Sequence, residues 1–246
     1  MKIRVAAVGD VHLGEDIRGR YREKLQGIEE HADVLLLAGD LTRHGTPAEG
    51  RIVAEEFGGL PVPVVTVLGN HDYHSDAEDE IGAMLDDAGI HVLRDDATVI
   101  SLDDGTRLGV AGGKGFGGGF AGKCASEFGE PQMKSFVGHT REIAERWHKA
   151  LKGLDDVDHR VVLSHYSPTK DTLAGEPLEI YPFLGSYLLA EAADAEGADL
   201  FLHGHAHHGT EKGVTPGGVR VRNVALPVLG RAYAVYCLGG EDPESC

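Results

Sequence analysis

The sequence has few cysteines and no long apolar run. Its three cysteines, Cys124, Cys237 and Cys246, include no pair at CxxC spacing. So small and odd a number argues against a disulfide framework and favours a reducing compartment. No stretch reaches the roughly 18 apolar residues needed to span a bilayer, and the run at Ile3–Val8 is too short for a signal peptide. We therefore expect a cytoplasmic protein with no membrane partner.

Positive charge and aromatic residues are also scarce. The chain has 23 Lys and Arg against 40 Asp and Glu, a formal net charge of −17, and its aromatic content is 6%. An acidic surface repels nucleic acids at long range, and few aromatic rings leave few platforms for stacking bases. The composition therefore favours a small-molecule partner over a nucleic acid, and it leaves the oligomeric state open.

The chain does have short apolar runs that alternate with helical segments. Candidate buried strands at Ile3–Val8, Val34–Ala38 and 63–68 are separated by helices predicted at 20–30 and 47–57. This alternation predicts parallel βαβ units and an α/β fold. Later helices are predicted at 76–87, 131–151 and 182–195, and later strands at 161–163 and 200–202. Because the sequence shows no repeat and no linker, we predict one domain over 1–246.

Polar side chains follow almost every predicted strand. In open α/β sheets the functional crevice lies beyond the carboxyl ends of the strands, so these side chains should converge. They are Asp10, His12, Asp40, Asn70, His71, Asp72, His165, His205 and His207. A single Asp or Asn after a strand is usually only a turn or capping residue. The whole set, which combines imidazole and carboxylate without thiolate, suits Zn, Fe or Mn and is large enough for two ions if one carboxylate bridges them.

Five segments together resemble the ordered motifs of the calcineurin-like metallophosphoesterase family. They are GDVH at 9–12, GDLT at 39–42, GNHD at 69–72, SH at 164–165 and GHAH at 204–207. The resemblance implies two stacked mixed β-sheets flanked by helices, a four-layer sandwich. It also implies metal-dependent hydrolysis of phosphate esters by a hydroxide held between two metal ions.

The same resemblance implies a role for each motif residue. Asp10, His12, Asp40 and His207 would bind one divalent ion, and Asp40, Asn70, His165 and His205 the other, with Asp40 bridging. His71 would contact the phosphoryl or leaving-group oxygen, and Asp72 would orient His71 and favour its protonated form. The ligand set accepts Mn, Fe, Zn or Co, of which we favour Mn.

Other candidate residues lie close to the motifs. Arg43 and His74 follow the second and third motifs and are weaker candidates for substrate binding. A glycine-rich segment at about 112–131 is predicted to form a flexible loop over the active site. Its stretch from Gly117 to Cys124 also nearly matches the phosphate-binding loop GxxxxGKS/T, but Cys124 replaces the hydroxyl residue.

The functions that remain are of three kinds. We favour hydrolysis of a small phosphate diester or monoester, and the sequence does not separate these two. A nuclease of the same chemistry is the first alternative, although the charge of −17 disfavours it. A scaffold that has kept the fold and lost catalysis is the second, but no motif residue is missing.

Overall fold

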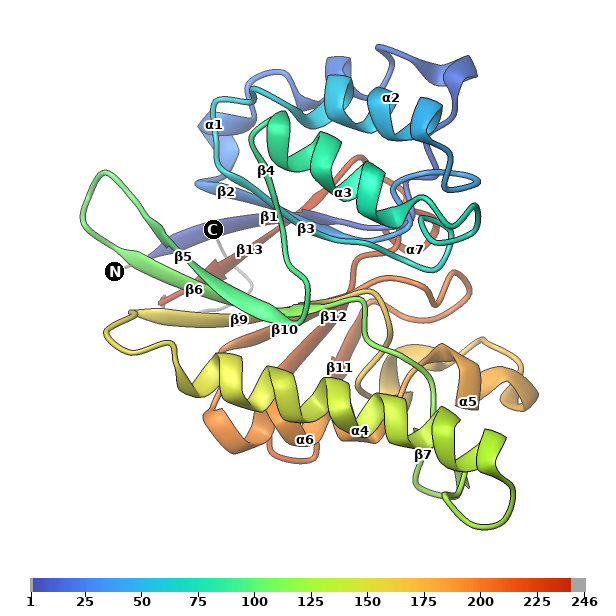
Figure 1. Cartoon of the computed structure of the whole chain (residues 1–246). Coiled ribbons are helices and arrows are strands. Elements are labelled where there is room, and N and C mark those ends of the chain that lie inside the picture. Colours follow the sequence, from blue (N-terminus) through green and yellow to red (C-terminus); the bar gives the residue numbers. More distant parts are fainter. Residues whose placement is uncertain (1, 240–246) are drawn as a thin grey trace.

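The structure is a computed structural model, which describes residues 2–239. Two β-sheets lie face to face, with helices on both outer sides (Figure 1). The first sheet, in spatial order, contains β13 (Ala234–Leu238), β1 (Ile3–Val8), β2 (Val34–Ala38), β3 (Val64–Val67) and β4 (Ile90–Val92). The second contains β11 (Lys212–Val214), β12 (Arg220–Asn223), β10 (Leu200–His203), β9 (His159–Ser164), β6 (Arg107–Gly113) and β5 (Asp96–Ser101).

Both sheets are mixed, as predicted. In the first sheet, β1 to β4 pair in parallel and β13 pairs antiparallel with β1. In the second, β6, β9, β10 and β12 run parallel, and β5 and β11 pair antiparallel at the two edges. The carboxyl ends of the central strands of each sheet therefore lie along one edge, which is where the polar side chains were expected.

The helices form the two outer layers (Figure 1). α1 (Ile28–His31), α2 (Pro47–Phe57) and α3 (Glu78–Asp87) cover the first sheet, while α4 (Pro131–Lys152) and α6 (Tyr187–Glu196) cover the second. Two further short helices are α5 (Tyr181–Leu184) and α7 (Leu226–Leu229). Single 3₁₀ turns occur at Glu15–Ile17, Arg22–Leu25, Lys170–Leu173 and Leu178–Ile180.

The helix predicted at 47–57 is confirmed, and local chemistry explains its start. Thr46 and Glu49 form a capping box ahead of Pro47. The helix predicted at 20–30 is wrong, because Gly27 adopts a left-handed φ of 72° and leaves only a 3₁₀ turn and α1. The helix predicted at 182–195 is divided at Gly185, where a Cβ atom would lie 1.9 Å from the Ser167 carbonyl oxygen.

Apolar side chains fill the spaces between the layers. The inter-sheet core includes Val5, Leu36 and Leu163, and a second core packs β1 and β2 against the helices with Leu35 and Phe57. Every residue of β2 is buried, because this strand is covered on both faces. This is why it reads as a continuous apolar run instead of an alternating one.

The glycine-rich segment is tightly packed over its first half. A Cβ atom at Gly112 would lie 1.9 Å from the Leu163 carbonyl oxygen, so only glycine allows β6 and β9 to approach this closely. Beyond it, β7 (Gly119–Phe120) and β8 (Lys123–Cys124) form a short hairpin beside α5. Cys124 therefore lies in a strand and not at the start of a helix, which agrees with the sequence argument against a phosphate-binding loop.

Three further observations concern the cysteines and the lengths of the helices. Cys237 is disulfide-bonded, which the expectation of a chain without a disulfide framework does not include. Cys124 is free and exposed. Within residues 2–239, no helix combines the length and the apolar character needed to cross a membrane.

Candidate metal centre

The residues predicted at the strand ends converge from both sheets. Two groups have ligand atoms that all lie within 4.8 Å of one another. The first donor set is Asp10, His12, Asp40 and His207, and the second is Asp40, His165 and His205. Asn70 joins the second set, since its Oδ1 atom lies 2.9 Å from Nε2 of His165. Because Asp40 belongs to both sets and all donors are carboxylate, amide or imidazole, the residues fit two adjacent divalent ions.

The backbone is strained at four of these ligands. Asp10, His12, Asp40 and His205 have φ values of 56°, 44°, 50° and 70°. Within residues 2–239, only seven non-glycine residues have a positive φ, so most of them are predicted ligands. Such conformations persist where the surrounding structure enforces them, and they cluster at functional sites.

The motif glycines leave room for the carboxylates. A Cβ atom at Gly69 would lie 2.1 Å from Oδ1 of Asp40, and one at Gly204 would lie 2.3 Å from Oδ2 of Asp10. Any side chain at either position would occupy the space of a donor atom. Gly69 and Gly204 are therefore part of the site's geometry.

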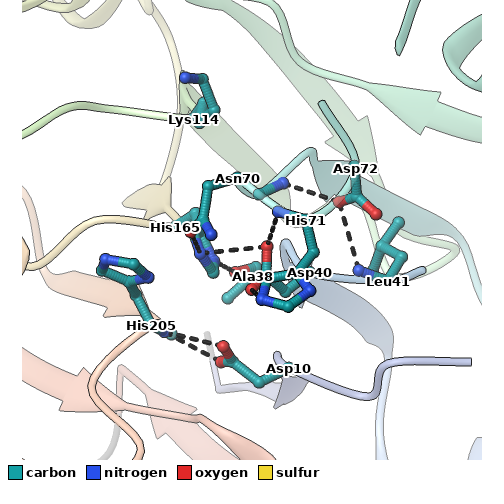
Figure 2. A network of polar contacts seen from close by, with 12 residues as sticks. Asp10, Ala38, Asp40, Leu41, Asn70, His71, Asp72, Lys114, His165 and His205 are labelled. Carbon is teal, nitrogen blue, oxygen red and sulfur yellow. Dashed lines mark hydrogen bonds and ion pairs between the residues drawn. The ribbon is translucent and has the colours of Figure 1, made fainter. Parts of the chain in front are cut away.

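Backbone carbonyl groups orient two of the imidazoles, and Figure 2 shows that of Ala38 beside His165. A carbonyl oxygen only accepts, so Nδ1 of His165 donates to the Ala38 oxygen at 2.9 Å. This leaves the lone pair of His165 on Nε2, which lies 3.3 Å from Oδ1 of Asp40. His205 donates from Nε2 to the Phe183 oxygen at 3.2 Å, and its lone pair is on Nδ1. Both rings are thereby held in tautomers that present a lone pair.

Burial sets the charge state of the donors. It raises the pKa of Asp10 to about 6, with a further contribution from the Asp40 charge. It lowers the pKa of His205 to about 3 and the pKa of His165 well below its usual value. By contrast, the hydrogen bond that His207 donates to the Asp10 carboxylate raises the pKa of His207. The buried imidazoles are therefore neutral, which is the form that binds a metal.

His71 lies beside the donor sets but is held by a different partner from the one predicted. Its Nδ1 donates to the Arg43 carbonyl oxygen at 2.8 Å, and its backbone N–H donates to Oδ1 of Asp40 at 2.8 Å. Its Nε2 lies 3.9 Å from Oδ2 of Asp40, and 44% of the side chain is exposed. The ring therefore faces the metal site with a nitrogen that remains open to a substrate.

Asp72 does not orient His71, contrary to the prediction. Its carboxylate accepts from the backbone N–H groups of Leu41, Thr42 and Gly69 and from the Thr42 hydroxyl. Figure 2 shows the carboxylate directed to Leu41 and away from the imidazole. The side chain is fully buried, which raises its pKa to about 6, and a buried carboxylate needs several donors. Asp72 thus braces the loops after β2 and β3.

The two weaker candidates lie apart from the donors. Arg43 pairs its guanidinium with Asp16 at 3.0 Å on the exposed surface. His74 is exposed. Within residues 2–239, neither side chain forms a hydrogen bond or ion pair with a donor-set residue. Arg43 contributes to the site through its backbone carbonyl group, which accepts a hydrogen bond from His71. No pattern of side chains in the sequence predicts such a contact.

Lys114 is a site residue that the sequence interpretation missed. Its carbonyl oxygen accepts from the backbone N–H groups of His165 and Tyr166, both at 3.1 Å, and burial lowers the pKa of its ammonium group. Lys114 comes directly after β6, just as His165 comes directly after β9. The same strand-end argument that selected His165 would therefore have selected Lys114.

Comparison with known proteins agrees with this geometry. The family model for the calcineurin-like phosphoesterases matches residues 3–209. The chain belongs to the calcineurin-like phosphoesterase family. No curated protein matches its sequence.

Solved structures share the fold at low sequence identity. The phosphopantetheinyl hydrolase of Mycobacterium tuberculosis is 15% identical with a TM-score of 0.69, over 98% of this chain and 97% of the other. A Plasmodium protein described as the anchor in the inner membrane complex is 13% identical with a TM-score of 0.59, over 96% and 81%. A Thermus thermophilus protein is 17% identical with a TM-score of 0.58, over 96% and 98%. At these identities the likeness concerns the fold alone.

Proposed function

We propose that the protein hydrolyses a small phosphate ester, a diester or a monoester, with the help of two divalent metal ions. The observation that supports this proposal most strongly is that two donor sets share Asp40 in a member of the calcineurin-like phosphoesterase family. Mn²⁺ is the ion we favour, although the imidazole and carboxylate donors also suit Fe, Zn and Co. The formal charge of −17 supports a small substrate over a nucleic acid.

The chain's own residues position the reaction. When bound, two adjacent divalent ions lower the pKa of a water molecule and offset the negative charge of a phosphoryl group. Asp40 is fixed for its shared role by the backbone N–H group of His71 at 2.8 Å. Ala38 and Phe183 hold His165 and His205 in the orientations that present their lone pairs. Little reorganisation of these ligands is then needed.

His71 has the geometry of a proton donor. Its Nδ1 proton is engaged by the Arg43 carbonyl oxygen. Nε2 lies on the exposed side of the ring near Asp40. When protonated, Nε2 donates a hydrogen bond to a phosphoryl oxygen or a proton to the leaving alcohol.

The test is hydrolysis of p-nitrophenyl phosphate and bis-p-nitrophenyl phosphate by metal-stripped protein, before and after Mn²⁺ is restored. We expect turnover only with metal. His71→Ala should lower kcat by about 10²- to 10³-fold, the loss typical of removing one transition-state donor, with unchanged metal content. His31→Ala, at an exposed position on α1, is the control. Wild-type protein that binds no metal would overturn the proposal, and equal rates for His71→Ala and the wild type would remove His71 from the mechanism.

A further inference from the structure

The ammonium group of Lys114 lacks an acceptor. Within residues 2–239, no carboxylate lies within ion-pair distance of Nζ, and the group forms no hydrogen bond. The residue is partly buried. A half-buried cation with no acceptor is costly unless something outside the chain satisfies it.

Three aromatic rings hold this ammonium group in place. Nζ lies 4.4 Å from the ring centroid of Tyr73, 5.3 Å from that of Phe116 and 5.8 Å from that of Tyr166. These distances are within the range of cation–π contacts, which limit the motion of the side chain without supplying a negative charge. The cation is therefore positioned in advance, and its charge remains available to a ligand.

Lys114 extends the row of metal ligands along the second sheet. β10, β9 and β6 are neighbours in that order, and their carboxyl ends lead into His205, His165 and Lys114. Figure 2 shows Lys114 on the same side of the site as Asn70 and His165. Its backbone carbonyl group also holds the His165 backbone at 3.1 Å. The backbone that carries the ammonium group is thus hydrogen-bonded to the backbone of His165 in the second donor set.

The acidic groups near Lys114 act on it without forming an ion pair with Nζ. Glu78, Asp79 and Asp95 line the same cavity of about 240 Å³. Asp95 is engaged by Arg146 at 2.8 Å and by the indole N–H of Trp147 at 2.7 Å. Glu78, whose buried Oε2 atom has no hydrogen-bond partner among the described residues, and Asp40 act on Lys114 at longer range.

We infer that Lys114 is a substrate-binding residue whose ammonium group binds an anionic oxygen of the phosphate ester, an inference that rests on the proposed function. The oxygen belongs either to the phosphoryl group that is cleaved or to a second anionic group next to it. In both cases the ammonium group forms a charge-assisted hydrogen bond, while the three rings keep it aligned.

The experiment measures binding of inorganic phosphate and of pyrophosphate to the Mn²⁺-loaded protein by isothermal titration calorimetry. The variants are Lys114→Met, Lys114→Gln and Lys114→Arg, with Lys152→Met at an exposed position of α4 as the control. We expect the two neutral variants to weaken binding by about tenfold or more, as for loss of a charge-assisted hydrogen bond. Arg should restore part of the affinity. A similar loss for both probes assigns the contact to the cleaved phosphoryl group, and a loss for pyrophosphate alone assigns it to the neighbouring anion.

A purely structural role for Lys114 predicts a different pattern. Metal content and Tm would fall in both neutral variants, Arg would not rescue binding, and the Kd of each probe per loaded site would match the wild type; this pattern would overturn the inference. Unchanged phosphate and pyrophosphate binding in stable, metal-loaded Lys114→Met would overturn it as well. If p-nitrophenyl phosphate turnover is normal in the wild type and in Lys114→Met, and the variant binds both phosphate and pyrophosphate as the wild type does, only the inference fails. If the wild type binds phosphate through Lys114 but hydrolyses no ester, the proposed function fails.

Discussion

The two donor sets share Asp40 but differ in how readily their imidazoles take up a proton. In the first set, 23% of the His12 side chain and 35% of the His207 side chain are exposed, and His207 is paired with Asp10 at 2.8 Å. In the second set, His165 is fully buried and burial lowers the pKa of both imidazoles. His205 is partly exposed, as His12 and His207 are, so the sets differ chiefly in proton uptake. The imidazoles of the second set stay neutral, whereas a proton competes with a metal ion for His207. Two ions bound here should differ in affinity and in exchange rate.

The largest effect is expected from substitution of Asp40, the residue that both donor sets share. Asp40→Ala takes a ligand from both sets at once, so we expect both metal equivalents and all metal-dependent turnover to be lost. Metal content per chain, measured by mass spectrometry, checks this. Asp87→Ala, at an exposed position of α3, is the matched control. Retention of one tightly bound equivalent in Asp40→Ala would show that the carboxylate is not shared.

Removing one imidazole from each set in turn should show which metal equivalent each set binds. His165→Ala should weaken the affinity for the second metal equivalent by at least about 100-fold. This is the upper end of the loss seen when a group that only hydrogen-bonds to a metal ligand is removed. The substitution should also destabilise the apo protein by about 1–3 kcal/mol, because the Ala38 carbonyl group loses its buried donor. His12→Ala should release only the first equivalent and change apo stability by less than about 0.5 kcal/mol. Loss of both equivalents in both variants would mean that the two sets bind as one unit.

As the pH falls, the ion bound by the first donor set should be released before the ion bound by the second. The pKa of His207 is raised by its hydrogen bond to Asp10, so this ring gains a proton at a higher pH than an ordinary imidazole does. That proton occupies the Nε2 atom that faces the donors. The pKa of His205 is lowered to about 3, so the second set stays deprotonated as the pH falls. Equilibrium dialysis across mildly acidic pH should show the first equivalent leaving before the second, and simultaneous release would contradict the comparison.

The smallest effect concerns a residue outside both sets. Arg43→Ala should change kcat/KM by less than about 3-fold, because the guanidinium is engaged by Asp16 in an exposed pair of modest strength. The carbonyl oxygen that holds His71 remains in the variant. Steady-state kinetics on the preferred ester provides the measurement, and a tenfold loss would return Arg43 to the list of substrate contacts.

The sequence predicted those parts of the site that local patterns specify. Buried strands read as apolar runs, and the polar residues at their ends predict that Asp10, Asp40 and His165 lie close together, as they do in the structure. The prediction that Asp72 orients His71 is wrong, because the partners of Asp72 come from backbone N–H groups whose positions depend on how two loops pack. Every residue has a backbone carbonyl group, so the residue type does not predict contacts such as that of the Arg43 carbonyl oxygen.

Lys114 and the strained backbone mark two further limits. Lys114 comes directly after β6, as His165 comes directly after β9, but lysine is not a metal-ligand type, so the search for metal ligands does not select it. The positive φ values of Asp10, His12, Asp40 and His205 result from the way both sheets meet at the site. Asp and His tolerate this conformation better than most residues, but the sequence does not reveal that it is adopted.

The distance along the chain between the ligands has a consequence for folding. Asp10 and His207 are 197 residues apart and belong to different sheets. Such long-range closure comes late, because its entropic cost precedes any compensating contact. A metal ion that binds only the closed arrangement stabilises the finished chain and none of its partly folded forms. An ion bound between these ligands would therefore stabilise only chains in which the two sheets are already stacked, and it would leave incompletely folded chains as sensitive to proteases as they are without metal.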